Sequence, residues 1–432
     1  MDANHPFAIF TPEKRTFFLD GADYFSNWST LIYTRLFKEP EYGLKITGNS
    51  GSHSYGVMSI ADKDTTYLVP GNQGSQLVTL DGLRSDNQMF RYRYDLGDSS
   101  NLGMTFTNRQ AEGYENQMLS FDGKYRVSKS DSVKFQYLNS SSVYPDGVDE
   151  TISDSAISGN YTHIGRDWNW IITYHRFGED FRADSGFVSK SNWEQRAVLL
   201  SHHWYPENKN TWWKKATMTA QWNRTADLNK LQLGEDRAVE FFITGIYQST
   251  LGFWIGDLNE YYIDQIFNKK VNEIFGGFTP VPGLDFEFDY LWGDEIDYSA
   301  VELAKVKTMI STIGYQISQN WRFSVEHVRQ ILDSEITQIY DVSFYNTRLS
   351  YQMDTNSFFR LTFQGETDQI GLKQNHDNLK DLGTQFLYSY QVNPFTRLYL
   401  GYSDHSFKEF EEIHLKRDKR KLFMKFSYAW QL

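Results

Sequence analysis

Residues 87–96 (NQMFRYRYDL) and 283–291 (GLDFEFDYL) decide the fold class. In both stretches, aromatic and aliphatic residues at every second position alternate mainly with Arg, Asp or Glu. Because successive strand side chains point to opposite faces, each stretch predicts a β-strand with one apolar and one charged face. Such a strand suits a barrel wall that has lipid on one side and water on the other.

The same alternation recurs along the chain from about residue 30, in segments of about ten residues. Further examples are residues 167–175, 321–327, 358–364, 384–392 and 396–403. A membrane-crossing strand needs about 9 to 11 residues, so the segments have a suitable length. We predict an all-β chain that forms a transmembrane up-and-down antiparallel β-barrel of about 22 strands, within a range of about 20 to 22.

Short and long connections alternate between the predicted strands. The short ones are rich in Gly, Asn, Asp, Pro and Ser, which favour tight turns. The longer, polar ones span residues 62–86, 143–154, 178–188, 226–236, 365–381 and 404–419. In a meander, this alternation places long loops on one rim and short turns on the other, as in outer-membrane barrels. We therefore expect the chain to lie in a bacterial outer membrane, in contact with its lipid.

A large soluble β protein, such as a propeller, is the alternative fold, since its strands also alternate. Soluble strands are about 5 to 6 residues long, however, and their apolar face packs on another sheet. The aromatic residues Trp204, Tyr205, Trp212 and Trp213 bracket a predicted turn at residues 206–210. Aromatic rings favour the membrane interface, so this clustering supports the membrane barrel.

Composition and motifs exclude several other classes of protein. The formal net charge is -12 and the chain has no block of Lys and Arg, so we expect no nucleic-acid partner. Cysteine is absent, and the adjacent His202 and His203 point to opposite strand faces, so we predict no metal site. No G-x-S-x-G, H-E-x-x-H or phosphate-binding loop occurs, so we predict neither catalytic residues nor a cofactor.

The C-terminal stretch, residues 421–432 (KLFMKFSYAWQL), is a further alternating strand. Its last residues resemble the signal that outer-membrane barrels present to the barrel assembly machinery. The matching positions are Lys425, Ser427, Trp430 and Leu432. We expect this strand to place its apolar face against lipid and to close the barrel onto the first strand.

The N-terminal stretch carries a distinctive phrase. It consists of Pro12, Glu13, Lys14, Arg15, Phe17, Phe18, Leu19, Asp20, Gly21, Ala22 and Asp23. The phrase is close to P-E-K-R-x-F-F-L-[ED]-G-A-D, and it is followed by Y-T-R and a Y-G-x-K-x-T-G-x-S-G hairpin. With these motifs the chain resembles an uncharacterised bacterial family of outer-membrane β-barrels. Family members usually carry a signal peptide and a carbohydrate-binding-module-like domain ahead of this phrase. The resemblance thus implies a truncated chain, an outer-membrane location and a connection with glycans.

The sequence predicts two domains. Residues 1–29 are predicted to form an irregular N-terminal segment, and residues 30–432 are predicted to form the barrel. The segment combines a rigid Pro12, the charged Glu13, Lys14 and Arg15, and a flexible turn at Asp20 and Gly21. One interpretation is a plug in the lumen that pairs its charges with the wall, and the other is a strap packed on the barrel rim.

Charged residues on the polar strand faces are candidates to line the lumen. They are Arg91, Arg93, Asp122, Lys124, Arg126, Asp285, Glu287, Asp289, Arg322, Arg360 and Arg397. The early strands would form a basic wall and the strand around Asp285 an acidic one, which would orient polar solutes. Salt bridges within a filled lumen are the alternative interpretation.

These observations favour a channel or conduit for polar solutes, with glycans as one candidate class. Barrels of this size usually carry a plug. A lumen-filled membrane scaffold that anchors a periplasmic or surface partner is the first alternative. A barrel-embedded hydrolase is the second.

Overall fold

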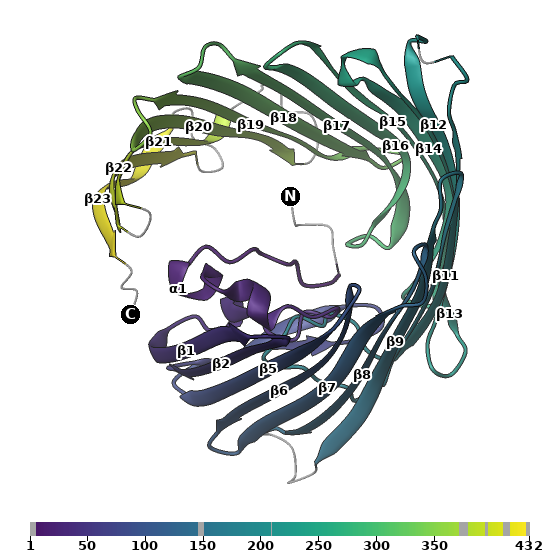
Figure 1. The fold of residues 1–432 in the computed structure, drawn as a ribbon, viewed down its shortest axis with the longest axis vertical. Coiled ribbons are helices and arrows are strands. Elements are labelled where there is room, and N and C mark those ends of the chain that lie inside the picture. The colour runs from purple at the N-terminus through teal and green to yellow at the C-terminus, as the bar shows by residue number, and fades with distance from the viewer. Residues whose placement is uncertain are drawn as a thin grey trace.

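The computed structural model describes residues 6–145, 151–208, 210–370, 379–393, 396–408 and 415–428. Within these ranges, 21 strands form one sheet and two more form a separate hairpin. The sheet curves into a ring, and the N-terminal residues lie inside it (Figure 1). No helix in the described part of the chain is long and apolar enough to cross a membrane.

The strands follow the alternating pattern closely. The large sheet contains β1 (Pro40–Ser50), β2 (His53–Asp62), β5 (Ser85–Gly97), β6 (Ser100–Ala111), β7 (Tyr114–Arg126), β8 (Asp131–Val143), β9 (Ile152–Ile164), β10 (Trp168–Phe177), β11 (Trp193–Trp204), β12 (Trp213–Ala226), β13 (Gln232–Gly245), β14 (Thr250–Tyr262), β15 (Gln265–Val281), β16 (Leu284–Asp297), β17 (Glu302–Gln316), β18 (Trp321–Asp333), β19 (Gln338–Gln352), β20 (Ser357–Ile370), β21 (Leu379–Asn393), β22 (Thr396–Phe407) and β23 (Lys416–Tyr428). The remaining elements are the hairpin strands β3 (Thr65–Pro70) and β4 (Ser75–Leu80), α1 (Thr16–Leu19), and the 3-10 helices η1 (Ala22–Phe25), η2 (Thr34–Leu36) and η3 (Ile246–Gln248).

Between the edge strands β1 and β23, each strand of the large sheet pairs with its neighbours in the chain, except that β2 pairs with β5 across the β3–β4 hairpin. The pairs are antiparallel, as in the register of β16 with β17. This arrangement confirms the predicted up-and-down barrel, and its 21 strands fall within the predicted range. The first strand begins at Pro40 rather than near residue 30, so residues 6–39 belong together as the N-terminal segment.

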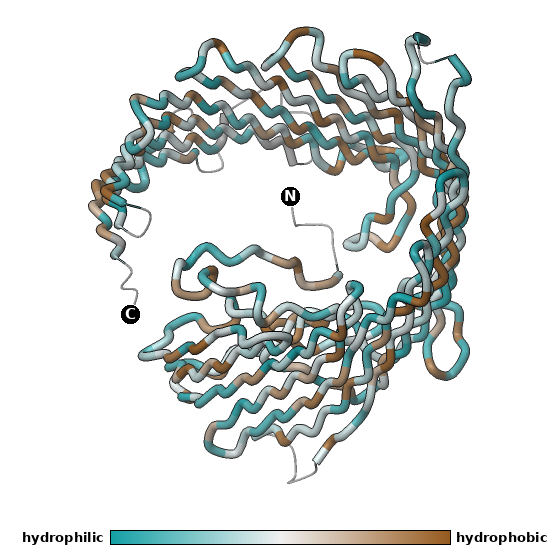
Figure 2. Tube along the Cα trace, in the orientation of Figure 1, coloured by the Kyte–Doolittle hydropathy of each residue, from teal (hydrophilic) through white to brown (hydrophobic). Residues whose placement is uncertain are grey.

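The outer face of the sheet is apolar. Leu44 on β1 is 63% exposed, Ile255 on β14 is 53% exposed and Met424 on β23 is 73% exposed. Figure 2 shows hydrophobic and hydrophilic residues alternating along the strands. Because exposed apolar side chains are stable against lipid and costly in water, this face forms the lipid-facing surface of the barrel.

The longer connections lie on one rim, as the sequence predicts. This rim carries the β3–β4 hairpin between β2 and β5 and the loop of residues 178–192 between β10 and β11. It also carries two-residue turns, such as residues 112–113 between β6 and β7, so the alternation of loop length is not strict. The opposite rim carries short connections, including residues 205–212, where Trp204 at the end of β11 and Trp212 at the end of the connection are exposed.

The seam between β1 and β23 is the open part of the ring. Because 21 is odd and neighbouring strands are antiparallel, these two strands run in the same direction. In the described residues, β1 pairs only with β2 and β23 only with β22, so the predicted pairing of last and first strand is not observed. Trp430 and Leu432 of the predicted assembly signal lie outside the described residues, and the signal stays a prediction.

The helix α1 lies at this seam on the inner side of the sheet. Lys45 of β1 donates hydrogen bonds to the carbonyl oxygens of Phe17 and Asp20. Lys425 of β23 donates a 2.9 Å hydrogen bond from Nζ to Oγ1 of Thr16. The N-terminal segment therefore connects the two edge strands of the sheet.

Candidate functional site

The N-terminal segment is held against the inner wall by an apolar cluster. Phe18, Phe25 and Phe37 of the segment pack against inward-facing side chains of β2 and β5. Phe37 is fully buried, and Phe25 lies over the backbone of Gly56 on β2. Burying three phenylalanine rings gives a large favourable contribution, so the segment is an integral part of the lumen.

Glu13 and Arg15 of the predicted motif fold onto η2. Glu13 Oε2 accepts hydrogen bonds from Arg15 Nη2 at 2.8 Å and from Thr34 Oγ1 at 2.7 Å. Arg15 Nη1 donates to the carbonyl oxygen of Phe37 at 2.6 Å. Burial alone would raise the pKa of Glu13, but these hydrogen bonds and those from the backbone amides of Arg15 and Lys14 lower it to about 2. The motif is therefore an internal anchor of the segment.

The loop of residues 178–192 folds inward and pairs with the segment. Thr30 and Phe187 form an antiparallel β-bridge, with a 2.7 Å hydrogen bond from Phe187 N to Thr30 O. Tyr33 N donates to Ser185 O at 2.7 Å. Gly186 leaves room for this contact, since a Cβ atom there would lie 2.5 Å from Thr30 O.

Buried polar groups fix the loop to the wall. Asp184 is fully buried, and its Oδ2 accepts hydrogen bonds from the hydroxyls of Tyr114 at 2.7 Å and Tyr144 at 2.9 Å. Burial raises the pKa of Asp184, although both tyrosine hydroxyls and the charge of Arg109 act to lower it. Arg109 Nη1 donates to Thr66 O of the β3–β4 hairpin and to Asp184 O. Loop, hairpin and wall therefore form one buried polar network.

The wall beneath the segment is polar, and its predicted pair Arg91 and Asp122 is buried. Arg91 Nη2 donates to Asp122 Oδ2 at 2.9 Å, and the two residues are 4% and 9% exposed. Gly103 on β6 leaves the space that the guanidinium group fills. Thr105, which Arg91 also contacts, accepts a 3.0 Å hydrogen bond from Asn27 of the segment. The pair therefore supports the contact between wall and segment.

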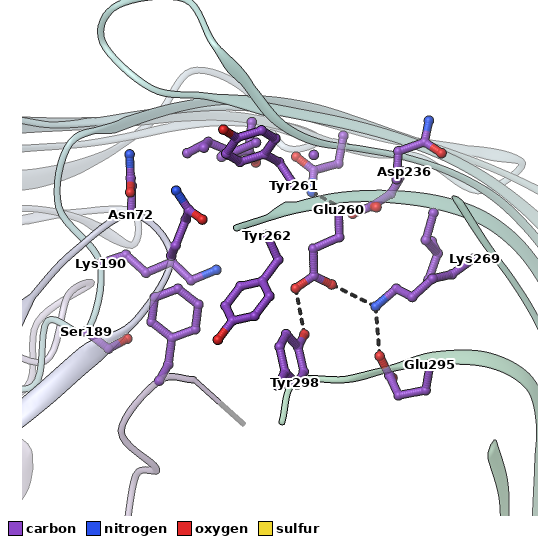
Figure 3. Close-up of a pocket in the computed structure, with 18 of the residues that line it drawn as sticks. Asn72, Ser189, Lys190, Asp236, Glu260, Tyr261, Tyr262, Lys269, Glu295 and Tyr298 are labelled. Atoms are coloured by element: carbon purple, nitrogen blue, oxygen red, sulfur yellow. Dashed lines mark hydrogen bonds and ion pairs between the residues drawn. The ribbon is translucent and has the colours of Figure 1, made fainter. Parts of the chain in front are cut away.

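A cavity of about 760 Å³ remains at the long-loop end of the lumen. Phe7 to Ile9 of the N-terminal segment and Ser189 and Lys190 of the inward loop line one side. The other side is the wall from β11 to β19, with Asp236, Glu260, Tyr262, Lys269, Glu295 and Tyr298 among its lining residues (Figure 3).

Lys269 is the centre of a charged network in this cavity. Its Nζ donates to Glu260 Oε2 at 2.7 Å and to Glu295 Oε1 at 3.0 Å. The Tyr298 hydroxyl donates to Glu260 Oε1 at 2.6 Å, and burial together with this hydrogen bond raises the pKa of Tyr298 (Figure 3). Lys190 Nζ lies 4.3 Å from the centre of the Phe7 ring. The cavity therefore combines fixed carboxylates, amines and aromatic faces.

The other predicted lumen residues lie along the inner wall in three places. Arg93, Lys124 and Arg126 lie toward the short-turn end of β5 and β7, where Arg126 binds the carbonyl oxygens of Ser128 and Lys129. Asp285, Glu287 and Asp289 lie on β16, and Asp285 Oδ1 accepts from Thr279 Oγ1 at 2.8 Å. Arg322, Arg360 and Arg397 lie on β18, β20 and β22. Of these predicted residues, the structure pairs Arg91 with Asp122, and Asp285, Glu287 and Asp289 lie at alternate positions on one face of β16.

Sequence reasoning missed the cavity residues Asp236, Glu260, Lys269 and Glu295 and the inward-facing Arg348. Polar and apolar residues alternate along these strands as they do along the others. The alternation could therefore have indicated which of these residues face the lumen. His202 and His203 do point to opposite faces. His202 packs between the rings of Trp168 and Trp204, whereas His203 Nε2 accepts a hydrogen bond from Asn169 Nδ2 and its Nδ1 is hydrogen-bonded to the Thr217 hydroxyl. Among the described residues, no three His, Asp or Glu side chains lie close enough to hold a metal ion.

No protein-family model matches the sequence, and no curated protein matches it. Among solved structures, the siderophore receptor PirA from Pseudomonas aeruginosa is similar, with 9% identity and a TM-score of 0.52, over 83% of this chain and 71% of the receptor. The copper transporter OprC is similar with 9% identity and a TM-score of 0.53, over 91% of this chain and 81% of the transporter. At this identity the likeness establishes the fold, which is that of outer-membrane β-barrels.

The fold and the apolar outer face together place the chain in the outer membrane. This confirms the predicted fold class and location. The lumen of this barrel holds an internal segment and a polar cavity.

Proposed function

We propose that the barrel is a conduit for polar solutes across the outer membrane, and that its N-terminal segment acts as a built-in partial plug. The single observation that carries this proposal is the cavity of about 760 Å³ between the segment and the wall from β11 to β19. A scaffold whose lumen only anchors a partner would have no need of a polar cavity beside its filling. The names of the similar structures, a siderophore receptor and a copper transporter, are consistent with transport of solutes.

The cavity favours solutes that carry many hydroxyl groups, and glycans are the proposed class. Rings of Tyr262 and Tyr298 meet edge to face at 4.9 Å beside the carboxylate of Glu260. Aromatic faces suit the apolar C–H faces of a sugar ring, and fixed carboxylates and amides accept or donate hydrogen bonds to its hydroxyls. The family resemblance of the N-terminal phrase to barrels with a carbohydrate-binding-module-like domain supports the same class.

Liposome swelling tests the proposal. Purified protein in liposomes should admit short oligosaccharides, and Tyr262→Ala should alter the uptake rate severalfold because it removes one aromatic wall of the cavity. Tyr345→Ala is the matched control, since Tyr345 is 43% exposed on the outer face and should leave uptake unchanged. Equal swelling for wild type, Tyr262→Ala and protein-free liposomes would contradict a conduit.

A further inference from the structure

A second charged site lies on the inner wall at the short-turn end, away from the cavity. Arg322 of β18 is directly opposite Ser350 of β19, and Ser350 is directly opposite Arg360 of β20. Arg348 lies two residues from Ser350 on the same face of β19. We call Arg322, Arg348 and Arg360 the arginine cluster.

The arginine cluster faces the lumen because the alternate residues of the same strands face outward. Trp321 and Tyr351 pack against each other on the outer face with ring centres 4.5 Å apart. Phe359 packs on the same face against Tyr388 at 4.8 Å. In Figure 1, the N-terminal segment lies on the side of the ring that β1 to β9 form, across the lumen from β18 to β20.

The register places the three guanidinium groups close enough to share one ligand. Neighbouring strands are about 4.8 Å apart, so Arg322 and Arg360 start about 10 Å apart and Arg348 lies between their strands. The positions between them carry small hydroxyl side chains, namely Ser324, Ser350 and Thr362. The long arginine side chains can therefore converge over a floor of hydroxyl groups.

The charges of the cluster have no protein partner in the described part of the chain. None of the three guanidinium groups forms an ion pair or a hydrogen bond there, and Arg348 and Arg360 act on each other as like charges. By contrast, Arg329 on the outer face of β18 pairs with Asp341 at 2.7 Å. The inward-facing Glu326 is engaged by Asn346 at 3.3 Å. Like charges held together are stabilised when an anion binds between them.

We propose that the arginine cluster is a binding site for a solute that carries phosphate or clustered carboxylate groups. Guanidinium groups present forked donors that match the oxygens of both anions, and the hydroxyls of Ser350 and Thr362 add further donors. The site lies at the opposite end of the lumen from the cavity. The proposal thus goes beyond the conduit and does not depend on glycan uptake.

Isothermal titration of the full chain in a neutral detergent with inorganic pyrophosphate tests the site. Wild type should bind, binding should weaken with added salt, and Arg348→Gln or Arg360→Gln should weaken it about tenfold each. Arg360→Lys should lie between, because it keeps the charge and loses the fork. Arg329→Gln, on the outer face, is the matched control and should bind like wild type.

The triple variant Arg322→Gln, Arg348→Gln and Arg360→Gln should lose pyrophosphate binding. The triple variant should keep the heat-modifiable mobility of a folded barrel in gel electrophoresis. If the triple variant does not fold, binding by the single variants tests the site. Phosphatidylglycerol retained by wild type and lost by the triple variant, without pyrophosphate binding, would support an anion site filled by a lipid headgroup. Pyrophosphate binding that is equal in wild type and the folded variants would overturn the proposal.

Discussion

At the scale of single residues, the buried pair of Arg91 and Asp122 makes the sharpest stability prediction. Arg91→Gln leaves the Asp122 carboxylate buried without its partner and should lower the free energy of unfolding by about 3–5 kcal/mol. Arg93→Gln is the control, because the Arg93 side chain is 42% exposed and pairs with Asp95 at 3.3 Å. Arg93→Gln should lower the free energy of unfolding by no more than about 1 kcal/mol. Urea unfolding in detergent micelles measures both, and equal losses would refute the buried role of the pair.

The lowered pKa of Glu13 leads to a prediction of how acid affects the N-terminal segment. Its pKa is lowered from 4.5 to about 2 in the folded state, so its contribution is fully present above pH 4.5 and is lost as the pH falls through about 2. Protection of residues 6–39 from hydrogen exchange should therefore decline over this window. Glu13→Gln should show weaker protection at neutral pH and should lose this part of the pH dependence. Lys14→Gln keeps the carboxylate and should behave like wild type; identical profiles for Glu13→Gln and wild type would contradict the anchor.

The residue scale also shows what sequence reasoning can predict. The motif around Glu13 and Arg15 was recognisable as a phrase, but its partner Thr34 lies 21 positions away in an irregular stretch. No periodicity relates such positions, because neither residue is in a strand. The charged wall residues could be predicted from strand phase, whereas their pairing, as between Arg91 and Asp122, depends on the register of three strands.

At the scale of strands, the two faces of β17 should differ sharply in their tolerance of charge. Met309 is 36% exposed on the outer face at the middle of the strand, and Met309→Arg should cost about 2–4 kcal/mol in a bilayer. Thr312 is opposite Glu287 and Glu326 on the inner face, so Thr312→Arg should be tolerated. Folding yield into liposomes compares the two variants, and equal yields would show that the assigned faces are wrong.

The β-bridge between Thr30 and Phe187 offers a reversible lock for the segment. Directly opposed residues in an antiparallel pair have a Cα separation that suits a disulfide, and the chain has no other cysteine. The double variant Thr30→Cys and Phe187→Cys should conduct ions less when oxidised than when reduced, because the lock holds the plug in place. A paired control with Thr30→Cys alone should not respond to reductant. Equal conductance in both redox states of the double variant would mean that the segment does not restrict the lumen.

The strands could be predicted because their two-residue period is a local feature of the sequence. The elements that fold into the lumen could not be predicted in this way. The hairpin β3–β4 and the loop of residues 178–192 appeared in the sequence only as long polar connections. Their position inside the ring depends on contacts with distant residues, such as the hydrogen bonds from Arg109 to Thr66 and Asp184. The start of the barrel was set near residue 30 because residues 30–39 alternate weakly, yet they belong to the N-terminal segment.

At the scale of the whole molecule, the lumen has two chemically different ends. The long-loop end holds the cavity with Glu260, Glu295 and Lys269, and the short-turn end holds the arginine cluster. Asp285 and Glu287 of β16 also lie toward the short-turn end, two strands before Arg322 of β18. The predicted basic wall on the early strands and acidic wall on β16 stay a prediction, and Arg91 of the early strands is paired with Asp122. A solute that crosses the barrel would meet the two ends in sequence.

The seam is the other feature of the whole molecule. Unpaired strand edges are very unfavourable in lipid, and α1 holds β1 and β23 through Lys45 and Lys425 on the lumen side. Lys425→Ala should therefore lower the temperature at which the barrel loses its heat-modifiable mobility. Lys421→Ala, on the same face of β23, is the matched control and should have the smaller effect. A larger decrease in this temperature for Lys421→Ala than for Lys425→Ala would argue against α1 as the link across the seam.

Single-channel conductance of the full chain in planar bilayers tests the central claim most directly. A conduit with a partial plug predicts discrete conductance steps that added oligosaccharide reduces, because sugar and ions share the path past the cavity. A lumen-filled scaffold predicts no steps, even in the reduced double-cysteine variant. The absence of steps in both proteins would contradict the conduit.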